Sequence, residues 1–200
     1  MRKIPAVVGK VFRFKFCDGP VSNSARNFFE IFDLAPGFAI DLERLTGRYR
    51  ELQRLVHPDK YAHGSDQERR LAVQMAANIN DAFRTLKDPV ERALYLLRLQ
   101  NVPVDDESAR HVDPEFLLEQ MELREALGEV RGSSYAAEDL IKIFATIDKL
   151  EKQTLGALAA AFTRDDTAAL RSANEHVQKL RFIKRLRGEA QEVEEHLTSH

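Results

Sequence analysis

Apolar positions recur at helical spacing along most of the chain after Ser24. Within residues 42–56 they fall every three or four positions, on one stripe at about 100° per residue, as in an amphipathic helix. The stretch after Ser65 carries a matching stripe. The two stripes consist of Leu42, Leu45, Tyr49, Leu52 and Val56, and of Leu71, Met75, Ile79, Phe83 and Leu86. Two striped helices joined by a short loop are expected to pack antiparallel.

Local signals predict where these helices begin and end. Asp41 is suited to cap the first helix, and Pro58 disfavours helical geometry at the preceding residue, so this helix should stop near Val56. Ser65 to Glu68 forms a capping box that starts the next helix. Asp88-Pro89 then combines a capping side chain with proline at the first helical position and predicts another helix.

The remaining chain is also read as helical. A short helix is expected at 25–34, before the pair, and a polar linker at 101–112, after it. Three longer helices should follow at 114–131, 135–163 and 166–197, and their short connections favour an up-down-up bundle. The pattern therefore predicts an all-α protein.

Composition narrows the function classes. Hydrophobic residues make up 44% of the 200-residue chain and charged residues 31%, which is enough to bury a core. The net charge of −2 predicts no strong attraction to nucleic acid or to a membrane surface. Cys17 is the single cysteine, which excludes an internal disulfide and a multi-cysteine metal site. No apolar run approaches the roughly 20 residues that a membrane span needs. Residues 1–16 are basic, and 1–24 are expected to form an extension.

The tripeptide His57-Pro58-Asp59 stands at the end of the first striped helix. Proline shapes such a turn in advance, so these residues are suited to contact another protein. On the side of this helix away from the core stripe, and just beyond the turn, basic residues predict a positive surface: Arg44, Arg48, Arg50, Arg54 and Lys60. The chain has no glycine-rich phosphate loop and should not hydrolyse ATP alone. We therefore expect a protein that acts on another protein, with no catalytic residue and no cofactor.

Residues 25–100 resemble a J-domain. The resemblance rests on the basic helix, the His-Pro-Asp turn and the later segment Asn80-x-Ala82-Phe83-x-x-Leu86-x-Asp88-Pro89. J-domains dock on heat-shock ATPases of the DnaK type, and their tripeptide triggers ATP hydrolysis. The resemblance implies this role for His57, Pro58 and Asp59, with the arginines supplying docking.

The helix expected at 114–131 has apolar residues on two sides. Phe116, Leu123, Leu127 and Val130 form one stripe, suited to a core. Leu118 and Met121 lie opposite, among the carboxylates of Glu122, Glu125 and Glu129. A bundle helix needs only one buried stripe, so the second side is interpreted as a docking surface. The alternatives are scattered surface residues or contact with the J-domain.

Three segments resemble the HscB family of co-chaperones: Phe116 to Leu127, Arg92-Ala-x-Tyr-Leu-Leu97 and Lys179-Leu-Arg-Phe-Ile183. The resemblance covers 27–197 and implies that residues 113–200 form a scaffold-binding domain. Members of this family bring the iron–sulfur scaffold protein IscU to the chaperone HscA. The implied scaffold-binding residues are Leu117, Leu118, Met121, Glu122, Glu125, Glu129 and Phe182. Leu117 falls between the two stripes and could be partly core, and partial exposure is expected for Phe182.

Other interpretations stay open at this point. His57, Asp59 and His63 lack a further ligand for a metal site. The basic run 179–187 lacks the aromatic platforms of a nucleic-acid binder and is interpreted as a solvated helix end. A J-domain co-chaperone for a different client remains the main alternative. The expected location is the cytoplasm, with the mitochondrial matrix as the alternative, and the paired Cys-x-x-Cys motifs of some eukaryotic members are absent.

Overall fold

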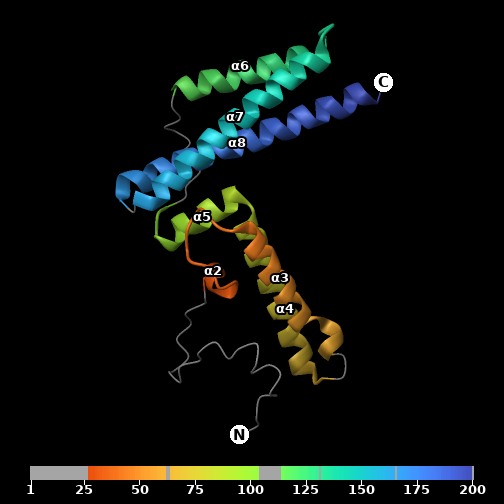
Figure 1. Ribbon diagram of the computed structural model, residues 1–200, viewed down its shortest axis with the longest axis vertical. Coiled ribbons are helices and arrows are strands. Elements are labelled where there is room, and N and C mark those ends of the chain that lie inside the picture. Colours follow the sequence, from red (N-terminus) through yellow and green to blue (C-terminus); the bar gives the residue numbers. More distant parts are fainter. Residues whose placement is uncertain (1–26, 62–63, 104–113, 131, 165, 200) are drawn as a thin grey trace. The chain divides into compact units, whose positions relative to one another are not determined.

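The computed structural model describes residues 27–61, 64–103, 114–130, 132–164 and 166–199, and every regular element among them is helical (Figure 1). The all-α prediction is therefore confirmed for this part of the chain. The predicted extension 1–24 and most of the predicted linker 101–112 lie outside the described residues. The elements are α2 (Phe28–Ile31), α3 (Leu42–Val56), the 3₁₀ turn η1 (Pro58–Tyr61), α4 (Asp66–Lys87), α5 (Pro89–Leu99), α6 (Pro114–Val130), α7 (Ala136–Arg164) and α8 (Thr167–Thr198).

The predicted helix starts are confirmed because each depends on a short-range hydrogen bond. The Asp41 carboxylate accepts the backbone N–H groups of Glu43 and Arg44, both at 2.9 Å, and so caps α3. Before α4, the Ser65 N–H donates to the Glu68 carboxylate at 2.8 Å, and the Glu68 N–H donates back to the Ser65 hydroxyl at 3.3 Å. These bonds from Ser65 lower the pKa of Glu68.

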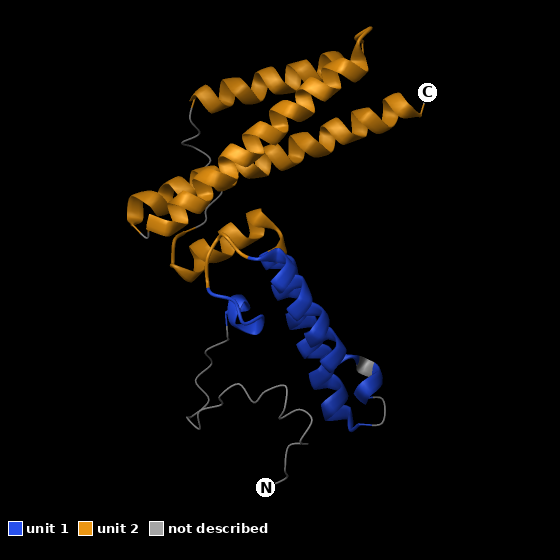
Figure 2. Cartoon of the chain, in the orientation of Figure 1, with its two compact units in different colours: residues 1–35, 41–86 blue, residues 36–40, 87–200 orange. Residues whose placement is uncertain are grey.

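The chain divides into two compact units (Figure 2). Unit 1 contains the described residues of Met1–Ala35 and Asp41–Leu86, and therefore α2, α3 and α4. Unit 2 contains Pro36–Ile40 and the described residues of Lys87–His200. The sequence assigned helix α5 to the J-domain. In the structure α5 belongs to unit 2, where it packs against α8. The domain boundaries at 25–100 and 113–200 stay a prediction.

Unit 1 holds its helical hairpin together with aromatic rings and one amide. The ring of Tyr49 on α3 stacks on that of Phe83 on α4, with centroids 4.0 Å apart, and Phe32 meets Phe83 edge to face at 6.5 Å. The Tyr49 hydroxyl donates to the Asn80 side-chain oxygen at 2.9 Å. Leu45 on α3 is fully buried. The antiparallel pairing predicted from the stripes is present.

Two members of the predicted stripes are not in the core. Leu42 is 48% exposed, and Leu71 is 44% exposed. Leu42 is the first residue of α3 and lies at the edge of the packed region. The small side chain of Ala72 faces the core instead of Leu71, which is rotated about 100° away from it on the helix. These two core assignments are wrong.

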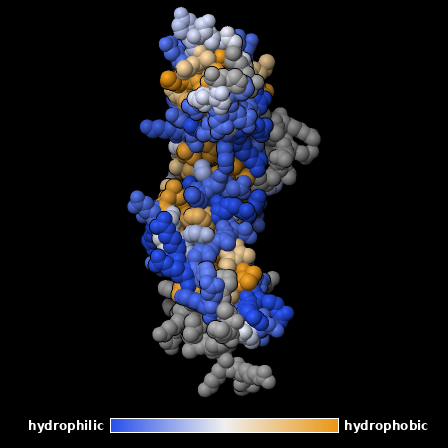
Figure 3. Space-filling model, turned by 90° about the vertical axis from the view of Figure 1, so that its right-hand side faces the viewer, coloured by the Kyte–Doolittle hydropathy of each residue, from blue (hydrophilic) through white to orange (hydrophobic). Residues whose placement is uncertain are grey.

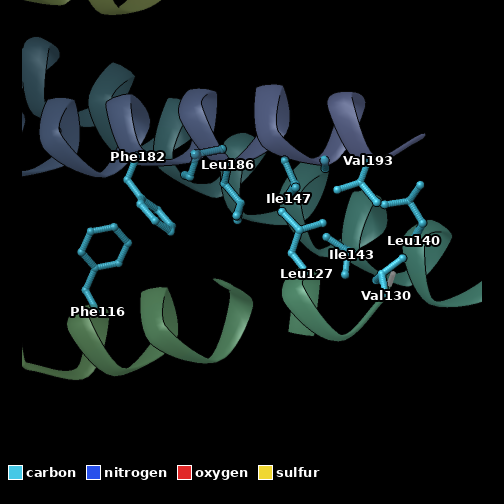
Figure 4. Close-up of a cluster of buried hydrophobic side chains, with 11 residues drawn as sticks. Phe116, Leu127, Val130, Leu140, Ile143, Ile147, Phe182, Leu186 and Val193 are labelled. Carbon is cyan, nitrogen blue, oxygen red and sulfur yellow. The ribbon is translucent and has the colours of Figure 1, made fainter. Parts of the chain in front are cut away.

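Unit 2 is built around a core shared by α6, α7 and α8 (Figure 4). Helix α7 packs against both α6 and α8, and α8 also packs against α5. The core residues are Phe116, Leu127, Val130, Leu140, Ile143, Ile147, Phe182, Ile183, Leu186, Ala190 and Val193. The three-helix C-terminal arrangement predicted from the sequence is confirmed.

A second aromatic contact brings the segment Pro36–Ile40 into unit 2. The ring of Phe38 stacks on that of Phe162 on α7, with centroids 5.6 Å apart. The guanidinium of Arg92 on α5 lies 5.0 Å from the Phe38 ring centroid, within cation–π range. Burial lowers the pKa of Arg92, although the charge of Asp88 acts in the opposite direction.

Asp88 combines two tasks in unit 2. One carboxylate oxygen accepts the backbone N–H groups of Val90 at 2.9 Å and Glu91 at 3.2 Å, which caps α5. The other oxygen forms an ion pair with Lys184 on α8. Burial by itself would raise the pKa of Asp88, but the hydrogen bonds and the charge of Lys184 together lower the pKa.

The lowered pKa predicts an acid-dependent part of the stability. The folded-state pKa lies below the unfolded value, so the stabilisation by Asp88 is complete above the unfolded pKa and is lost as the pH falls through the folded pKa. Asp88→Asn keeps a capping oxygen but loses the charge. We expect it to lower the free energy of unfolding by less than about 1 kcal/mol at neutral pH, because Lys184 is well exposed.

Urea denaturation between pH 7 and about pH 3 checks this prediction. The wild type should lose more stability on acidification than Asp88→Asn does. Asp88→Ala, which also removes the cap, should cost about 1 kcal/mol more than Asp88→Asn at neutral pH. Equal acid sensitivity of the wild type and Asp88→Asn would contradict the role given to the ion pair.

Candidate functional site

The His-Pro-Asp turn is fixed by backbone geometry. His57 follows the last residue of α3 with φ −57° and ψ 130°, the extended conformation that a following proline favours. The predicted end of this helix at Val56 is therefore confirmed. The chain then forms η1, in which the Lys60 N–H donates to the His57 carbonyl at 3.0 Å. The Tyr61 hydroxyl donates to the Leu55 carbonyl at 3.3 Å and ties the turn back to α3.

The polar side chains of this turn point into solvent. The side chain of His57 is 57% exposed and that of Asp59 is 89% exposed. The His57 Nδ1 lies 3.4 Å from both the Asp59 backbone nitrogen and the Asp59 carboxylate. One ring nitrogen cannot accept from the first and donate to the second at the same time, and both contacts are long. These weak contacts leave the imidazole and the carboxylate accessible to a partner.

The arginines of α3 divide into two pairs with different surroundings. Arg44 donates to the Asp33 carbonyl at 2.8 Å and lies 3.3 Å from its carboxylate. Arg48 pairs with Glu51 at 2.9 Å. Arg50 and Arg54 are exposed, and the structure shows no ion pair between either and another described residue.

Helical geometry separates these pairs as well. At about 100° per residue, the four arginines span about 160° on the side of α3 away from the core stripe, with Arg50 and Arg54 on one half and Arg44 and Arg48 on the other. This placement agrees with the basic face expected from the sequence. Within the described residues, no intramolecular ion pair engages the guanidinium groups of Arg50 and Arg54. Lys60 is exposed in η1.

The second candidate surface lies on α6. Leu117, Leu118 and Met121 are 47%, 57% and 69% exposed, and we call these three residues the α6 apolar patch. The space-filling view shows apolar side chains at the molecular surface among polar ones (Figure 3). Leu117 belongs to this exposed side rather than to the core. The neighbouring carboxylates are also exposed, and they belong to Glu122, Glu125 and Glu129.

Phe182 does not belong to this exposed surface. Its side chain is only 6% exposed, and its ring meets that of Phe116 edge to face at 5.6 Å (Figure 4). The partial exposure expected from the sequence is wrong. Phe182 lies beside the buried Ile183 on α8, so both side chains take part in the core between α6, α7 and α8.

Sequence reasoning also missed a residue beside Phe182. The guanidinium of Arg124 on α6 lies 5.4 Å from the centroid of the Phe182 ring. Arg124 follows Leu117 by seven residues and Met121 by three, which is the spacing of neighbours on one side of a helix. That spacing was the signal in the sequence that places Arg124 next to the α6 apolar patch.

Other parts of the described chain offer little for chemistry. A hollow of about 340 Å³ lies at the connection between α6 and α7, and its lining includes Asp139 and Lys142. The Asp139 carboxylate accepts from Lys142 at 2.9 Å and from the Ser133 hydroxyl at 2.8 Å, and these bonds lower the pKa of Asp139. A carboxyl group held ionised in this way is poorly suited to act as a general acid.

Two further limits concern metal binding and membrane insertion. No cluster of three or more potential metal ligands occurs among the residues that the structure describes, and His63 lies outside them. Within the same residues, no helix combines the length and the apolar character needed to cross a bilayer.

Comparisons with known proteins agree over most of the chain. A family model described as the HSCB C-terminal oligomerisation domain matches residues 112–191. A curated co-chaperone protein HscB homolog from Shewanella halifaxensis is 40% identical over 171 residues, covering 86% of this chain and 98% of that protein.

Solved structures give the same result. Chaperone HscB from Vibrio cholerae is 37% identical with a TM-score of 0.79, covering 86% of this chain and 99% of that one. Human co-chaperone protein HscB is 29% identical with a TM-score of 0.78, covering 86% of this chain and 84% of that one.

Proposed function

Because the chain belongs to the HscB family of co-chaperones, we propose that it brings an iron–sulfur scaffold protein of the IscU type to a DnaK-type chaperone of the HscA type. It would stimulate the ATPase of that chaperone and so assist the maturation of iron–sulfur clusters. The observation that carries the proposal is the exposure of His57 and Asp59 on a turn whose backbone is fixed. The relatives are co-chaperones, and the chain itself supplies no catalytic step in this function.

The proposed contact with the chaperone uses the His-Pro-Asp turn and the basic residues of α3. A turn that is already ordered loses little conformational entropy when it docks. Asp59 can accept charge-assisted hydrogen bonds from a cationic partner, which are stronger than neutral ones. Arg50 and Arg54 would steer encounter with an acidic surface, because their charges are exposed. Arg44, Arg48 and Lys60 complete the proposed docking region.

The proposed contact with the scaffold uses the α6 apolar patch and its carboxylates. Interfaces of this kind combine a small apolar centre with a charged surround. Glu122, Glu125 and Glu129 would face cationic groups of the scaffold. With both surfaces on one chain, scaffold and chaperone are held at a high effective concentration, so each separate contact needs only modest affinity. We place this activity in the cytoplasm, in line with the bacterial source of the curated relative.

Loss of either polar side chain at the turn should separate the two activities. We expect Asp59→Ala or His57→Gln to abolish stimulation of the chaperone ATPase while scaffold binding is retained. Both residues are exposed, so the free energy of unfolding should change by no more than about 0.5 kcal/mol. The measurement is steady-state ATP turnover by an HscA-type chaperone, with calorimetry of scaffold binding on the same samples. Full stimulation by both variants would remove the turn from the mechanism.

Truncation of the α6 apolar patch should weaken the other contact. We expect Leu118→Ala with Met121→Ala to reduce scaffold affinity by about 2 kcal/mol or more, as loss of interface anchors does. Isothermal titration calorimetry with an IscU-type scaffold measures this. Ile141→Ala is a matched control, because Ile141 on α7 is also strongly exposed. Unchanged affinity in the double variant, or binding of an unrelated client through this helix, would favour a co-chaperone for another client.

Charge reversal on α3 should act mainly through the rate of encounter. We expect Arg50→Glu with Arg54→Glu to slow association with the chaperone strongly at low ionic strength, and by a smaller factor at high ionic strength, because salt screens exposed charges. Stopped-flow association kinetics at two salt concentrations test this. Arg84→Glu serves as the control, since Arg84 is an exposed arginine on α4. An effect of equal size at both salt concentrations would argue against steering.

A further inference from the structure

The exposed side of α6 has two unlike edges. At about 100° per residue, the order around the helix runs from Arg124 through Leu117 and Met121 to Glu125, Leu118, Glu129 and Glu122. The edge of the α6 apolar patch beside Leu117 is therefore basic, and at the other edge Leu118 lies among carboxylates. All of these side chains are exposed. A partner that covers the whole patch must meet both edges.

The basic edge is held in place by buried aromatic rings. The Arg124 guanidinium lies over the ring of Phe182, 5.4 Å from its centroid. The Lys179 ammonium lies over the neighbouring ring of Phe116 at 4.8 Å. The two rings meet edge to face between α6 and α8 (Figure 4). Each cation–π contact restrains a flexible basic side chain at the boundary between the core and solvent.

Arg124 keeps its hydrogen-bonding capacity in this position. The structure shows no hydrogen bond or ion pair from its guanidinium to another described residue. By contrast, Arg187 on α8 is engaged by the carboxylates of Asp148 at 2.6 Å and Glu151 at 2.7 Å. A guanidinium has five N–H donors in a planar fork that matches a carboxylate, so Arg124 is suited to bind one.

We propose that Arg124, positioned by the ring of Phe182, binds a carboxylate of the scaffold protein at the basic edge of the α6 apolar patch. This inference rests on the proposed function, since it takes the scaffold as the partner. It specifies the chemistry of that partner: an apolar contact in the centre, cationic groups opposite the glutamates and an acidic side chain opposite Arg124. Phe182 is then a positioning residue that acts through Arg124 and does not touch the partner.

This assignment differs from a purely structural role for Arg124. If the guanidinium only covers the Phe182 ring, its replacement should change the stability and leave scaffold affinity unaltered. If it binds a carboxylate, reversal of its charge should weaken binding by at least tenfold, because an attractive contact becomes a repulsive one. Arg124→Lys keeps the charge but loses the planar fork and should give an intermediate affinity.

Calorimetric titration of each variant with a recombinant IscU-type scaffold tests the proposal. Arg171→Glu is the matched control, because Arg171 is an exposed arginine on α8 and lies eleven residues before Phe182, roughly 16 Å along the helix. It should bind the scaffold within about twofold of the wild type, although its net charge equals that of Arg124→Glu. Equal loss in the two variants would indicate a general charge effect and overturn the proposal.

A double-mutant cycle tests the role given to Phe182. Phe182→Leu keeps an apolar side chain in the core but removes the ring under the guanidinium. We expect Phe182→Leu to weaken scaffold binding in the wild-type background and to have almost no further effect in the Arg124→Ala background. Additive losses would show that Phe182 acts independently of Arg124. Thermal unfolding of each variant identifies any that are not folded. If Phe182→Leu does not fold, the scaffold affinity of Arg124→Lys still tests the role of the guanidinium.

The Leu118→Ala and Met121→Ala double variant separates failure of this inference from failure of the proposed function. If that variant loses affinity and Arg124→Glu does not, the scaffold binds the α6 apolar patch and Arg124 takes no part in the contact. If neither change weakens binding, the scaffold does not bind this side of α6. Substitution of lysine for single acidic residues of the scaffold should restore binding to Arg124→Glu at one position, and failure at every exposed acidic position would contradict a carboxylate contact.

Discussion

A helix in a small bundle can bury only one side, and this constraint governs both candidate surfaces. On α6 the side that carries Phe116, Leu127 and Val130 is occupied by α7 and α8. Leu118 and Met121 must therefore face away from that core. On α3 the burial of Leu45 and Val56 likewise directs the arginines outward. On α6, apolar residues that the core does not use are thus exposed and available to a partner. On α3, the exposed residues are charged.

Features that depend on neighbouring residues could be predicted from the sequence. The caps formed by Asp41, Ser65 and Asp88 involve contacts within three residues, and the restriction before Pro58 involves one. Helix boundaries and the all-α class followed from these signals together with the apolar spacing. The exposed side of α6 was also predictable, because the two sides of that helix are separated by the 3.6-residue period alone.

Contacts between residues that are far apart in the chain could not be predicted from local sequence signals. Periodicity placed Leu71 on a stripe, but Leu71 is 44% exposed and the buried residue is its neighbour Ala72. Partial exposure was expected for Phe182 because its neighbours already filled a stripe, yet Phe116 on another helix provides a partner for its ring. The contact of Phe38 with Phe162 joins residues far apart in the chain and left no local signal.

The two surfaces suit a protein that must bind and release. The exposed arginines of α3 are well hydrated in the free protein, so in the proposed complex they would raise the rate of encounter and add little to its stability. The α6 apolar patch would supply the short-range contact that sets the dissociation rate. Arg124 borders this patch beside Leu117, and carboxylates surround Leu118 at its other edge, so the contiguous apolar area exposed to water is small. An extended apolar side would favour self-association. For the proposed complex, a small apolar patch with charges of opposite sign at its edges favours a partner with the complementary order of charges, so the edges would give specificity and the apolar centre affinity.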